Sequence, residues 1–409
     1  MKLRKPAVLS GLLSAALVLT SCGHTKPAAA PAALESVREI ASPAGADSAQ
    51  GNLAVGPDGA IYLSWMETAD DGSPMLKFAT LKDDKWSPAQ TIIKSEDLMV
   101  NWADFPSLLP MGGGLLAAHW LSMIPNSEEG YGIKIAFSRD NGKTWSKPVA
   151  PHRDHTKTEH GFVSLLPAPG GGVGVLWLDS RKLAGPKKSD DVALLYTTIG
   201  LDGKLGPETT IDGRVCECCQ PSAQQTTSGT LAVYRGRTKD EVRDITTVHF
   251  DGAKWSEPKV VFADGWKINA CPINGPAMAV EGNHVAVAWF TGANEQAKVE
   301  IAFSNDGGET FGPPQQVDDG KPMGRVNVVL QDSGSALVTW LERSDAGAQL
   351  RARRMQENGP RQPSLVVGTT DSGESAGFPR TARSGNNVLF AWTDAKASRV
   401  RVAVLYPKS

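Results

Sequence analysis

Seven aromatic residues recur along this chain at a nearly constant interval, and each of them closes a short β-rich run. Successive aromatics are 55, 57, 57, 55, 51 and 52 residues apart. They are Trp65, Trp120, Trp177, Tyr234, Trp289, Trp340 and Trp392. Such a long and regular period indicates a supersecondary unit that repeats seven times, rather than an irregular chain.

Each unit contains the same succession of predicted strands. A short apolar run such as "FPSLLP" and a Gly-rich turn precede the run that ends in the aromatic. An alternating run such as "KVEIAFS" and a final strand such as "EPKVVF" follow it. Alternation bounded by Gly, Asp, Asn and Pro is the signature of strands. Four antiparallel strands in each of seven units predict an all-β fold, a β-propeller with seven blades. Six blades are the alternative if one unit is degenerate.

The two ends of the repeat predict how the ring closes. The seventh unit has three predicted strands and ends near Leu405, whereas residues 34–40 (LESVREI) stand before the first unit without a partner. If this N-terminal strand pairs with the last unit, seven four-stranded blades are complete and no strand edge stays open. We therefore assign residues 34–409 to one propeller domain.

The first residues of the chain are typical of an export signal. Lys2, Arg4 and Lys5 precede an apolar stretch over residues 7–20, which is too short to span a bilayer comfortably. The small residues before Cys22 resemble the lipobox of bacterial lipoproteins, in which this cysteine carries the lipid. We expect a signal peptide over residues 1–21, lipidation of Cys22, and an Ala/Pro-rich tether over residues 22–33. An ordinary signal peptide with a chance cysteine is the alternative.

These features predict the location and limit the partners. Gly23 stands where an Asp often retains lipoproteins at the inner membrane. We therefore expect a lipid-anchored protein of the bacterial cell envelope, at the outer membrane, on its periplasmic or surface side. The formal charge of -2 and the pI of about 6.4 provide no basic surface, so nucleic acid is not an expected partner. We expect a monomer.

Two turns after predicted third strands share one motif. "SRDNGKTW" at residues 138–145 and "SNDGGETF" at residues 304–311 both fit S-x-D-x-G-x-T-(W/F). Asp140 and Asp306 can accept backbone N–H bonds inside these turns, and Gly142 and Gly308 can take positive φ without penalty. The motif resembles the Asp-box, or BNR repeat, of sialidases and their relatives. The resemblance implies a sialidase-like propeller in which these turns fasten the blades at the bottom rim.

Enzymes of that superfamily cleave terminal sialic acids with three arginines, a Tyr–Glu pair and an Asp. This chain lacks their Arg-Ile-Pro motif, and we predict seven blades where they have six. Tyr131 is predicted in a loop beside Glu128 and Glu129, but in the second unit, where it is poorly placed. A glycoside hydrolase of the exo-α-sialidase type is therefore the alternative hypothesis. Asp179 and Glu342 would be its carboxylates, although ordinary loop solvation explains them better.

Three arginines in the stretch "YRGRTKDEVRD" are candidates for a clamp on an anionic ligand. Arg235, Arg237 and Arg243 each present a planar fork of N–H donors, which matches the two oxygens of a carboxylate. A solvated loop of ion pairs is the alternative. The acidic residues available for it are Asp240, Glu241 and Asp244.

The connections into successive units carry four cysteines and three histidines. In a propeller such connections share one face with the loops after the second strands, and we call it the upper face. The residues are His152, His155, His160, Cys216, Cys218, Cys219 and Cys271. In an exported protein four cysteines predict two disulfides, and a bond from Cys218 or Cys219 to Cys271 would join neighbouring blades. The alternatives are a Cu(I) or Zn site that adds His155 or His160, and redox-active thiols. No cofactor is certain.

The segments "CECCQP", "VYRGRTKDEVRDI" and "GWKINACPINGPA" resemble a subgroup of exported bacterial sialidase-like proteins. This resemblance implies that the cysteines, the three arginines and Asn274 form a common surface. The leading hypothesis is an envelope lipoprotein whose propeller binds an anionic ligand, a glycan or a metal on its upper face. The alternatives are the hydrolase described above and an envelope scaffold protein.

Overall fold

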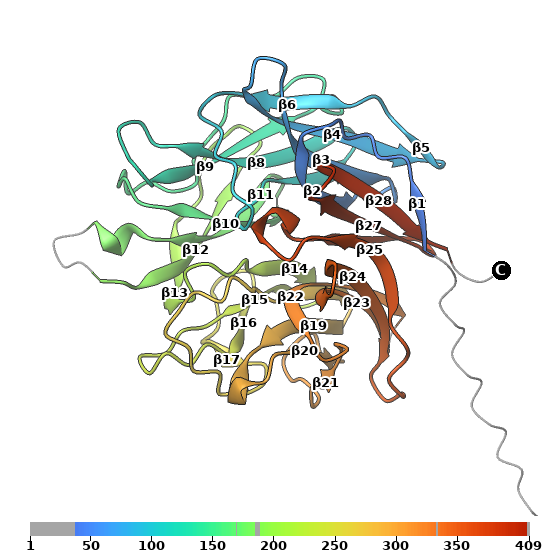
Figure 1. Cartoon of the computed structure of the whole chain (residues 1–409). Coiled ribbons are helices and arrows are strands. Elements are labelled where there is room, and N and C mark those ends of the chain that lie inside the picture. Colours follow the sequence, from blue (N-terminus) through green and yellow to red (C-terminus); the bar gives the residue numbers. More distant parts are fainter. Residues whose placement is uncertain (1–36, 169, 185–188, 333, 407–409) are drawn as a thin grey trace, which may run out of the picture.

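The computed structural model describes residues 37–406 except 169, 185–188 and 333. It shows seven β-sheets arranged in a ring (Figure 1). The prediction of an all-β propeller with seven blades is confirmed, and the six-bladed alternative is wrong. The predicted signal peptide, the lipidated Cys22 and the tether lie outside the described residues.

The blades follow one another in chain order. The first contains β2 (Ser48–Val55), β3 (Ile61–Thr68), β4 (Pro74–Lys82), β5 (Lys85–Trp86) and β6 (Gln90–Lys94). The second contains β7 (Ser107–Gly112), β8 (Leu115–Met123) and β9 (Tyr131–Ser138). The third contains β10 (His160–Pro167), β11 (Val173–Asp179), β12 (Val192–Ile199) and β13 (Thr209–Val215). The fourth contains β14 (Ser222–Thr226), β15 (Gly229–Arg235), β16 (Ile245–Phe250) and β17 (Lys259–Val260).

The last three blades repeat this order. The fifth contains β18 (Ala277–Glu281), β19 (His284–Thr291), β20 (Lys298–Ser304) and β21 (Gln315–Gln316). The sixth contains β22 (Pro322–Asp332), β23 (Ser335–Ser344), β24 (Gly347–Gln356) and β25 (Leu365–Thr370). The seventh contains β26 (Arg380–Ser384), β27 (Asn387–Asp394), β28 (Arg399–Leu405) and β1 (Val37–Ile40). Short 3₁₀ turns are η1 (Arg181–Leu183), η2 (Ala293–Glu295) and η3 (Glu374–Ala376).

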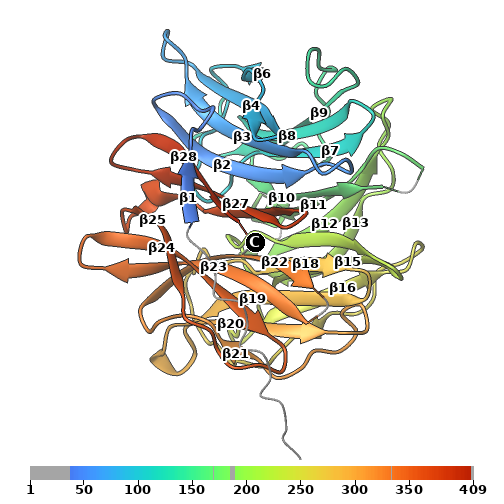
Figure 2. The same cartoon turned by 90° about the vertical axis from the view of Figure 1, so that its right-hand side faces the viewer.

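The N-terminal strand closes the ring as predicted. β1 pairs antiparallel with β28, with Val37 opposite Leu405 and Ile40 opposite Val402. Both views show the blue β1 beside the red β28 at the outside of the last blade (Figure 2). Pairing the first described strand with the last one removes the open edge that a linear array of blades would expose.

The second blade departs from the four-stranded pattern. Its sheet has three strands, and the fourth position is held by a single bridge between Ile135 and Val149. Pro148 has counterparts before the fourth strands of other blades, such as Pro207 and Pro258, whereas Pro151, two residues after Val149, has none. Because proline has no N–H to donate, it interrupts the hydrogen bonding of a strand, which accounts for the short pairing.

The seven aromatics that mark the repeat lie in the second strands and are buried between neighbouring sheets. Trp65, Trp177 and Trp289 have no exposed surface. Their apolar clusters join consecutive blades, as where Phe78 of the first blade packs with Leu116 and other residues of the second. The core is thus a ring of contacts between blades, in which each large ring fills one junction.

Carboxylates accept the N–H groups of several of these buried indoles. Asp179 accepts the Trp177 Nε1–H at 2.8 Å, and Glu342 accepts the Trp340 Nε1–H at 2.6 Å. Asp179 is fully buried and Glu342 nearly so. A buried indole N–H needs an acceptor, so these acids hold the core together. Loop solvation, which we expected for both acids, is therefore wrong.

The two Asp-box turns have matching internal bonds. Asp140 accepts from Ser138 Oγ at 2.8 Å, the Thr144 amide at 2.9 Å and Thr144 Oγ1 at 2.7 Å. Asp306 accepts the equivalent bonds from Ser304 and Thr310. Each motif therefore satisfies its own carboxylate, as the sequence pattern predicts.

Close packing fixes the glycine of the first of these turns. Gly142 has φ +83°, and a Cβ added there would lie 2.3 Å from Phe78 Cζ. Trp145 packs edge-on against the same Phe78 ring, which belongs to the preceding blade. The turn thus fastens two blades together.

Within the part of the chain that the structure describes, helical residues are confined to three short 3₁₀ turns. None of the helices found there has the length and apolar character needed to cross a membrane.

Candidate functional site

The innermost strands of the seven blades surround a central cavity of about 710 Å³. These strands are β2, β7, β10, β14, β18, β22 and β26. The loops that lead into them, which lie on the upper face, are residues 41–47, 95–106, 150–159, 216–221, 261–276, 317–321 and 371–379. Residues that begin the innermost strands therefore meet at the upper mouth of the cavity, although they come from different blades.

Arg380 stands at this mouth as the first residue of β26 and lines the cavity. Its guanidinium lies 4.1 Å from the centre of the Phe105 ring, and its buried Nε has no hydrogen-bond partner among the described residues. Burial lowers the pKa of Arg380 to about 10, with no neighbouring carboxylate to offset it. A buried cation without a counter-ion is costly, so this group is suited to meet an anion.

A second arginine, Arg325, lies near the same mouth, but its guanidinium donates hydrogen bonds to backbone carbonyls. Arg325 stacks over the Trp102 ring at 4.7 Å and donates to the carbonyls of Gly377 (2.9 Å) and Gly373 (3.1 Å). It therefore fixes the loop that leads into the seventh blade. Burial lowers the pKa of Arg325 to about 10. Because this is still well above neutral pH, the side chain is charged and adds to the positive character of the mouth.

A buried acid and an unpartnered amide oxygen lie on the same face. Asp104 is buried in the loop before β7; its Oδ1 accepts the Phe162 N–H at 2.8 Å, and the Tyr131 hydroxyl lies beside the same carboxyl group. Burial raises the pKa of Asp104 to about 7. Gln220 lines the cavity and donates to the Val163 carbonyl at 2.6 Å, but its buried Oε1 is unpartnered among the described residues.

Sequence reasoning missed Arg325, Arg380, Asp104 and Gln220 as site residues. A signal was present in the repeat, because Asp104, Gln220 and Arg380 all lie at or just before the start of an innermost strand. Applied to every unit, the register that identified the blades would have placed these polar residues at one mouth.

Arg235 is placed as a structural residue. It is 1% exposed, donates to the carbonyls of Asn274, Arg243 and Phe290, and stacks over the Trp266 ring at 4.9 Å. Because backbone carbonyls occupy its donors, Arg235 has no fork free for a carboxylate. This corrects its expected role in an anion clamp.

The Asn274 side chain is also occupied by hydrogen bonds to the backbone. Its Oδ1 accepts the Arg325 N–H at 2.7 Å, and its Nδ2 donates to the carbonyls of Pro272 (3.1 Å) and Met323 (3.3 Å). The side chain therefore joins the loop that leads into the fifth blade to the first strand of the sixth. It is not directed at the central cavity.

Arg237 and Arg243 take part in an ion-pair network. Arg237 pairs with Asp190 at 2.6 Å and with Glu241 at 3.0 Å, and Arg243 pairs with Glu217 at 2.7 Å and with Glu241 at 3.0 Å. The hydrogen bond from Arg237 is the main cause that lowers the pKa of Glu241 to about 2.

The alternative to an anion clamp was a loop of ion pairs with Asp240, Glu241 and Asp244. Among these three acids, Glu241 alone pairs with the arginines. Asp244 instead accepts the backbone N–H groups of Gly265 and Trp266. Among the described residues, Asp240 forms no ion pair.

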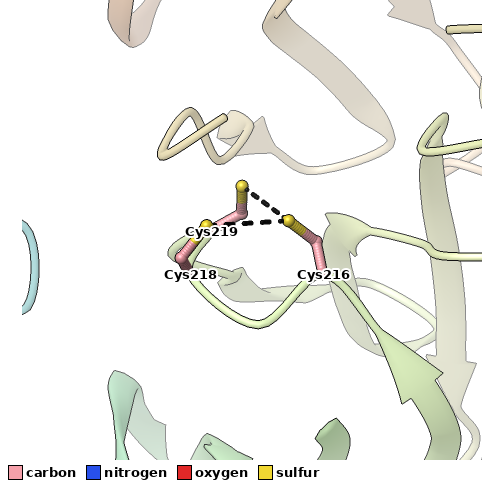
Figure 3. A group of neighbouring side chains, drawn as sticks. All are labelled: Cys216, Cys218 and Cys219. Carbon is pink, nitrogen blue, oxygen red and sulfur yellow. Dashed lines mark hydrogen bonds between the residues drawn. The ribbon is translucent and has the colours of Figure 1, made fainter. Parts of the chain in front are cut away.

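The four cysteines form one disulfide and one pair of thiols. Cys218 is bonded to Cys271, which joins the loop that leads into the fourth blade to the loop that leads into the fifth. Cys216 and Cys219 are free and buried. Figure 3 shows the Cys216 sulfur facing those of Cys219 and Cys218. It lies 3.0 Å from Cys219 Sγ and 3.9 Å from Cys218 Sγ. The predicted link between these loops is present, whereas the second predicted disulfide is not formed.

The two thiols differ in their ionisation. Arg243 Nη1 lies 3.3 Å from the Cys216 sulfur, and the Asn274 N–H donates to the Cys219 sulfur at 3.4 Å. Burial opposes ionisation of Cys216, but the contact with Cys219 and the charge of Arg235 lower its pKa to about 7. Burial and the neighbouring Cys216 raise the pKa of Cys219 well above the usual value. Cys216 is therefore the more acidic thiol of the pair.

The histidines form a separate group. His160 Nε2 lies 3.0 Å from Asp154 and 3.6 Å from Asp179, and its ring stacks on that of His152. Burial opposes protonation of His160, but the bond to Asp154 and the charge of Asp179 raise its pKa. His155 is exposed. His160 is thus a buried imidazole held between two acids.

The expected joint cluster of cysteines and histidines is not formed. Among the described residues, the groups that could hold a metal are Cys216, Cys218 and Cys219, and separately His152, Asp154 and His160. Cys218 is in a disulfide, which leaves two thiols in the first group. His152 Nε2 accepts the Ile133 N–H, so its Nδ1 carries the proton and offers no lone pair. Both arrangements are poor metal sites as they stand.

The chain is similar to a known protein family and to several solved structures. The profile of the BNR repeat-like domain family matches residues 59–375. An α-L-arabinanase of Penicillium chrysogenum solved with arabinobiose is 12% identical, with a TM-score of 0.50 over 91% of this chain and 99% of that chain. NanB sialidase of Streptococcus pneumoniae is 10% identical, with a TM-score of 0.47 over 85% and 83%. A comparison with curated proteins found no match. At these identities the structural likeness shows the fold alone.

Proposed function

The chain belongs to the family of BNR repeat-like domains, and from this premise we propose that it is an envelope protein that binds an anionic or glycan ligand on its upper face. The ligand would enter the upper mouth of the central cavity. Arg380 is the observation that carries this proposal, because its cation lines the cavity without a carboxylate partner. A carboxylate or sulfate group on a sugar would supply the missing counter-ion.

The other groups at the mouth suit the polar remainder of such a ligand. Gln220 Oε1 is an acceptor without a partner, and a sugar hydroxyl can donate to it. Aromatic rings at Trp102, Phe105 and Phe378 stack near the mouth, and pyranose and furanose rings pack well on aromatic faces. The comparable arabinanase was solved with arabinobiose, a carbohydrate.

Titration calorimetry on the full-length chain tests the proposal. We expect sialic acid or a uronic-acid disaccharide to bind, and neutral arabinobiose to bind more weakly. Arg380→Gln should weaken binding of the acidic sugar by at least about tenfold, because a charged hydrogen bond contributes about 1.5–3 kcal/mol. Arg380→Lys should recover part of the loss.

Arg383→Gln is the matched control. Arg383 lines the same cavity but donates to the carbonyls of Leu330 and Gly385, so its substitution should leave the affinity unchanged. Equal binding by the wild type and Arg380→Gln, or no binding of any acidic sugar, would reject the proposal. The scaffold hypothesis would then be favoured.

Hydrolysis is the second candidate, and the carboxyl group it would use is Asp104, which is 1% exposed and precedes the cavity-lining Phe105. A carboxyl group with a pKa of about 7 can act as a general acid near neutral pH. Two of the tyrosines argue against a tyrosine nucleophile, since burial raises the pKa of both Tyr131 and Tyr234. Tyr131 begins β9 and is buried, so its predicted loop position was wrong. Release of the fluorophore from a fluorogenic sialoside, abolished in Asp104→Asn, would establish the hydrolase.

The location is part of the same proposal and has its own test. We propose that residues 1–21 are removed, that Cys22 is lipidated, and that residues 22–33 connect the lipid to the propeller domain over residues 34–409 at the outer membrane. Incorporation of labelled palmitate into the wild type, and none into Cys22→Ser, is the expected result. Labelling of Cys22→Ser at the wild-type level would contradict lipidation at this residue.

A further inference from the structure

The spacing of Cys216 and Cys219 matches a known redox arrangement. In the sequence Cys216-Glu217-Cys218-Cys219 they are three positions apart, which is the C-x-x-C spacing of thiol–disulfide oxidoreductases. The first cysteine is the more acidic of the two and the second is deeply buried. In such motifs the first cysteine attacks and the second resolves the mixed disulfide.

A disulfide lies directly beside this dithiol. Cys216 Sγ is 3.9 Å from Cys218 Sγ, which is bonded to Cys271. Two sulfurs at this distance are close to van der Waals contact, so a thiolate on Cys216 needs only a small movement to reach the disulfide. A purely structural disulfide has no need of a thiolate next to it.

The two pairs differ in their access to solvent. Cys216 and Cys219 are each 1% exposed, whereas Cys218 is half-buried and Cys271 is exposed. A partner thiol or disulfide can therefore reach the Cys218–Cys271 pair but not the buried pair. The buried pair can exchange with the outside only through the exposed one.

We propose that the four cysteines form a two-pair thiol–disulfide relay, in which the exposed Cys218–Cys271 disulfide exchanges with the buried Cys216/Cys219 dithiol. The outer pair would react with a partner that carries a thiol or a disulfide. This inference does not rest on the ligand site proposed at the mouth of the cavity, although Gln220, which lines that cavity, directly follows Cys219.

The exchange balances without an external oxidant. The Cys216 thiolate attacks Cys218 Sγ, so that the Cys216–Cys218 bond forms, the Cys218–Cys271 bond breaks, and Cys271 leaves as a thiolate that takes a proton from solvent. Cys219 Sγ, 3.0 Å away, then attacks Cys216 Sγ. The Cys216–Cys219 bond forms, Cys218 leaves, and the proton of Cys219 passes to it. One disulfide is lost and one is gained, and two thiols appear in the outer pair.

Charged groups around Cys216 set the pH at which the relay works. Arg243 Nη1 lies 3.3 Å from its sulfur, the charge of Arg235 favours the thiolate, and the charge of Glu217 opposes it. Glu217 and Glu241 are themselves paired with Arg243. The first step should therefore accelerate as the pH rises through about 7.

The experiment starts from the full-length chain with Cys22→Ser, so that the four propeller cysteines supply all its thiols. It carries one disulfide at Cys218–Cys271, is prepared with one equivalent of oxidised glutathione and is held at pH 4. After a jump to pH 8 without reductant, a bulky polar maleimide is added and labelled peptides are mapped by mass spectrometry. We expect Cys271 to become labelled in this parent chain. Cys216→Ser should abolish this labelling, since no thiolate attacks Cys218.

Cys219→Ser is the matched control, because it keeps the attacking thiolate and removes only the second step. It should still label Cys271, with the remaining disulfide trapped between Cys216 and Cys218. Arg243→Gln should raise the pH midpoint of labelling by about one unit, and Arg243→Lys by less. An unlabelled Cys271 in the parent chain, or equal labelling in Cys216→Ser, would overturn the relay.

Discussion

Asp140 on the lower face and Asp104 on the upper face are two loop aspartates in opposite situations. Asp140 accepts bonds from Ser138 and Thr144 inside its own turn, and these bonds, led by the one from the Thr144 hydroxyl, lower its pKa to about 2. Asp104 is buried beside Tyr131, and that burial raises its pKa to about 7.

The contrast extends to the two faces around these residues. On the lower face, each Asp-box satisfies its polar groups within one local turn. On the upper face, Arg380 and Gln220 are left with unsatisfied atoms that line a cavity. Buried polar atoms are normally paired. Unpaired ones also occur at lower turns, at Trp86 and Trp255, so the contrast concerns the two Asp-boxes and the cavity alone. At the cavity the unpaired atoms of Arg380 and Gln220 support the proposed ligand site.

The largest expected effect is on the pH dependence of stability. Between about pH 4 and pH 7 folded Asp104 keeps a proton that the unfolded chain has released, so its raised pKa makes stability fall as the pH rises through this window. Asp104→Asn should remove up to about 4 kcal/mol of this fall. Urea unfolding at several pH values measures it. Asp140→Asn is the control, and an equal change in both variants would refute the contrast.

A smaller loss is expected from filling the space at a lower-face turn. Gly142→Val introduces a side chain where a Cβ would lie 2.3 Å from Phe78, at a φ of +83°. Strain and overpacking should together cost about 3 kcal/mol. Gly113→Val has a positive φ but open space around its Cβ, so it should cost only about 1 kcal/mol. Denaturant titration of both variants separates packing from backbone strain.

Removing an Asp-box carboxylate should cost less again. Asp306→Ala breaks the bonds to Ser304 and Thr310 but leaves the turn exposed to water, which can replace them. We expect the melting temperature to fall by a few degrees, with the upper-face affinity for an acidic sugar unchanged. A lost affinity would mean that the two faces are coupled.

The smallest effect on stability is expected at Arg380. Arg380→Met replaces a desolvated, unpaired cation by an apolar side chain that can still pack on Phe105, so stability should stay equal or rise by about 1 kcal/mol. Binding of the acidic sugar should nevertheless be lost. Calorimetric melting and ligand titration of the same variant test both halves, and marked destabilisation would show that Arg380 is structural.

Much of the fold could be predicted because each blade is specified by residues close together in the sequence. Each blade carries its own alternation, its own turn glycines and one large aromatic, so the spacing of Trp65, Trp120 and their successors gives the number of blades. The closing pair β1 and β28 followed from counting unpaired strands. The reduced fourth strand of the second blade was not predicted, although Pro151 indicates it.

The site was harder to predict because its residues bond to partners that are far away in the sequence. Arg235 resembled an anion ligand in sequence, yet it donates to carbonyls 39 and 55 residues away, at Asn274 and Phe290. Arg380 stood within an ordinary strand pattern, and only the closed ring places it in a cavity without a counter-ion. The C-x-x-C spacing of Cys216 and Cys219 was visible in the sequence, but their distance from the disulfide was not.

The sequence by itself determined the number of blades, the closing strand and the internal bonds of the Asp-box turns. These features depend on periods, turn residues and hydrogen bonds within a few residues, which a sequence expresses directly. The tertiary structure decided which upper-face groups are satisfied and which are left unpaired, and which cysteines are bonded. Such outcomes depend on contacts between loops of different blades, and the closed ring fixes those contacts.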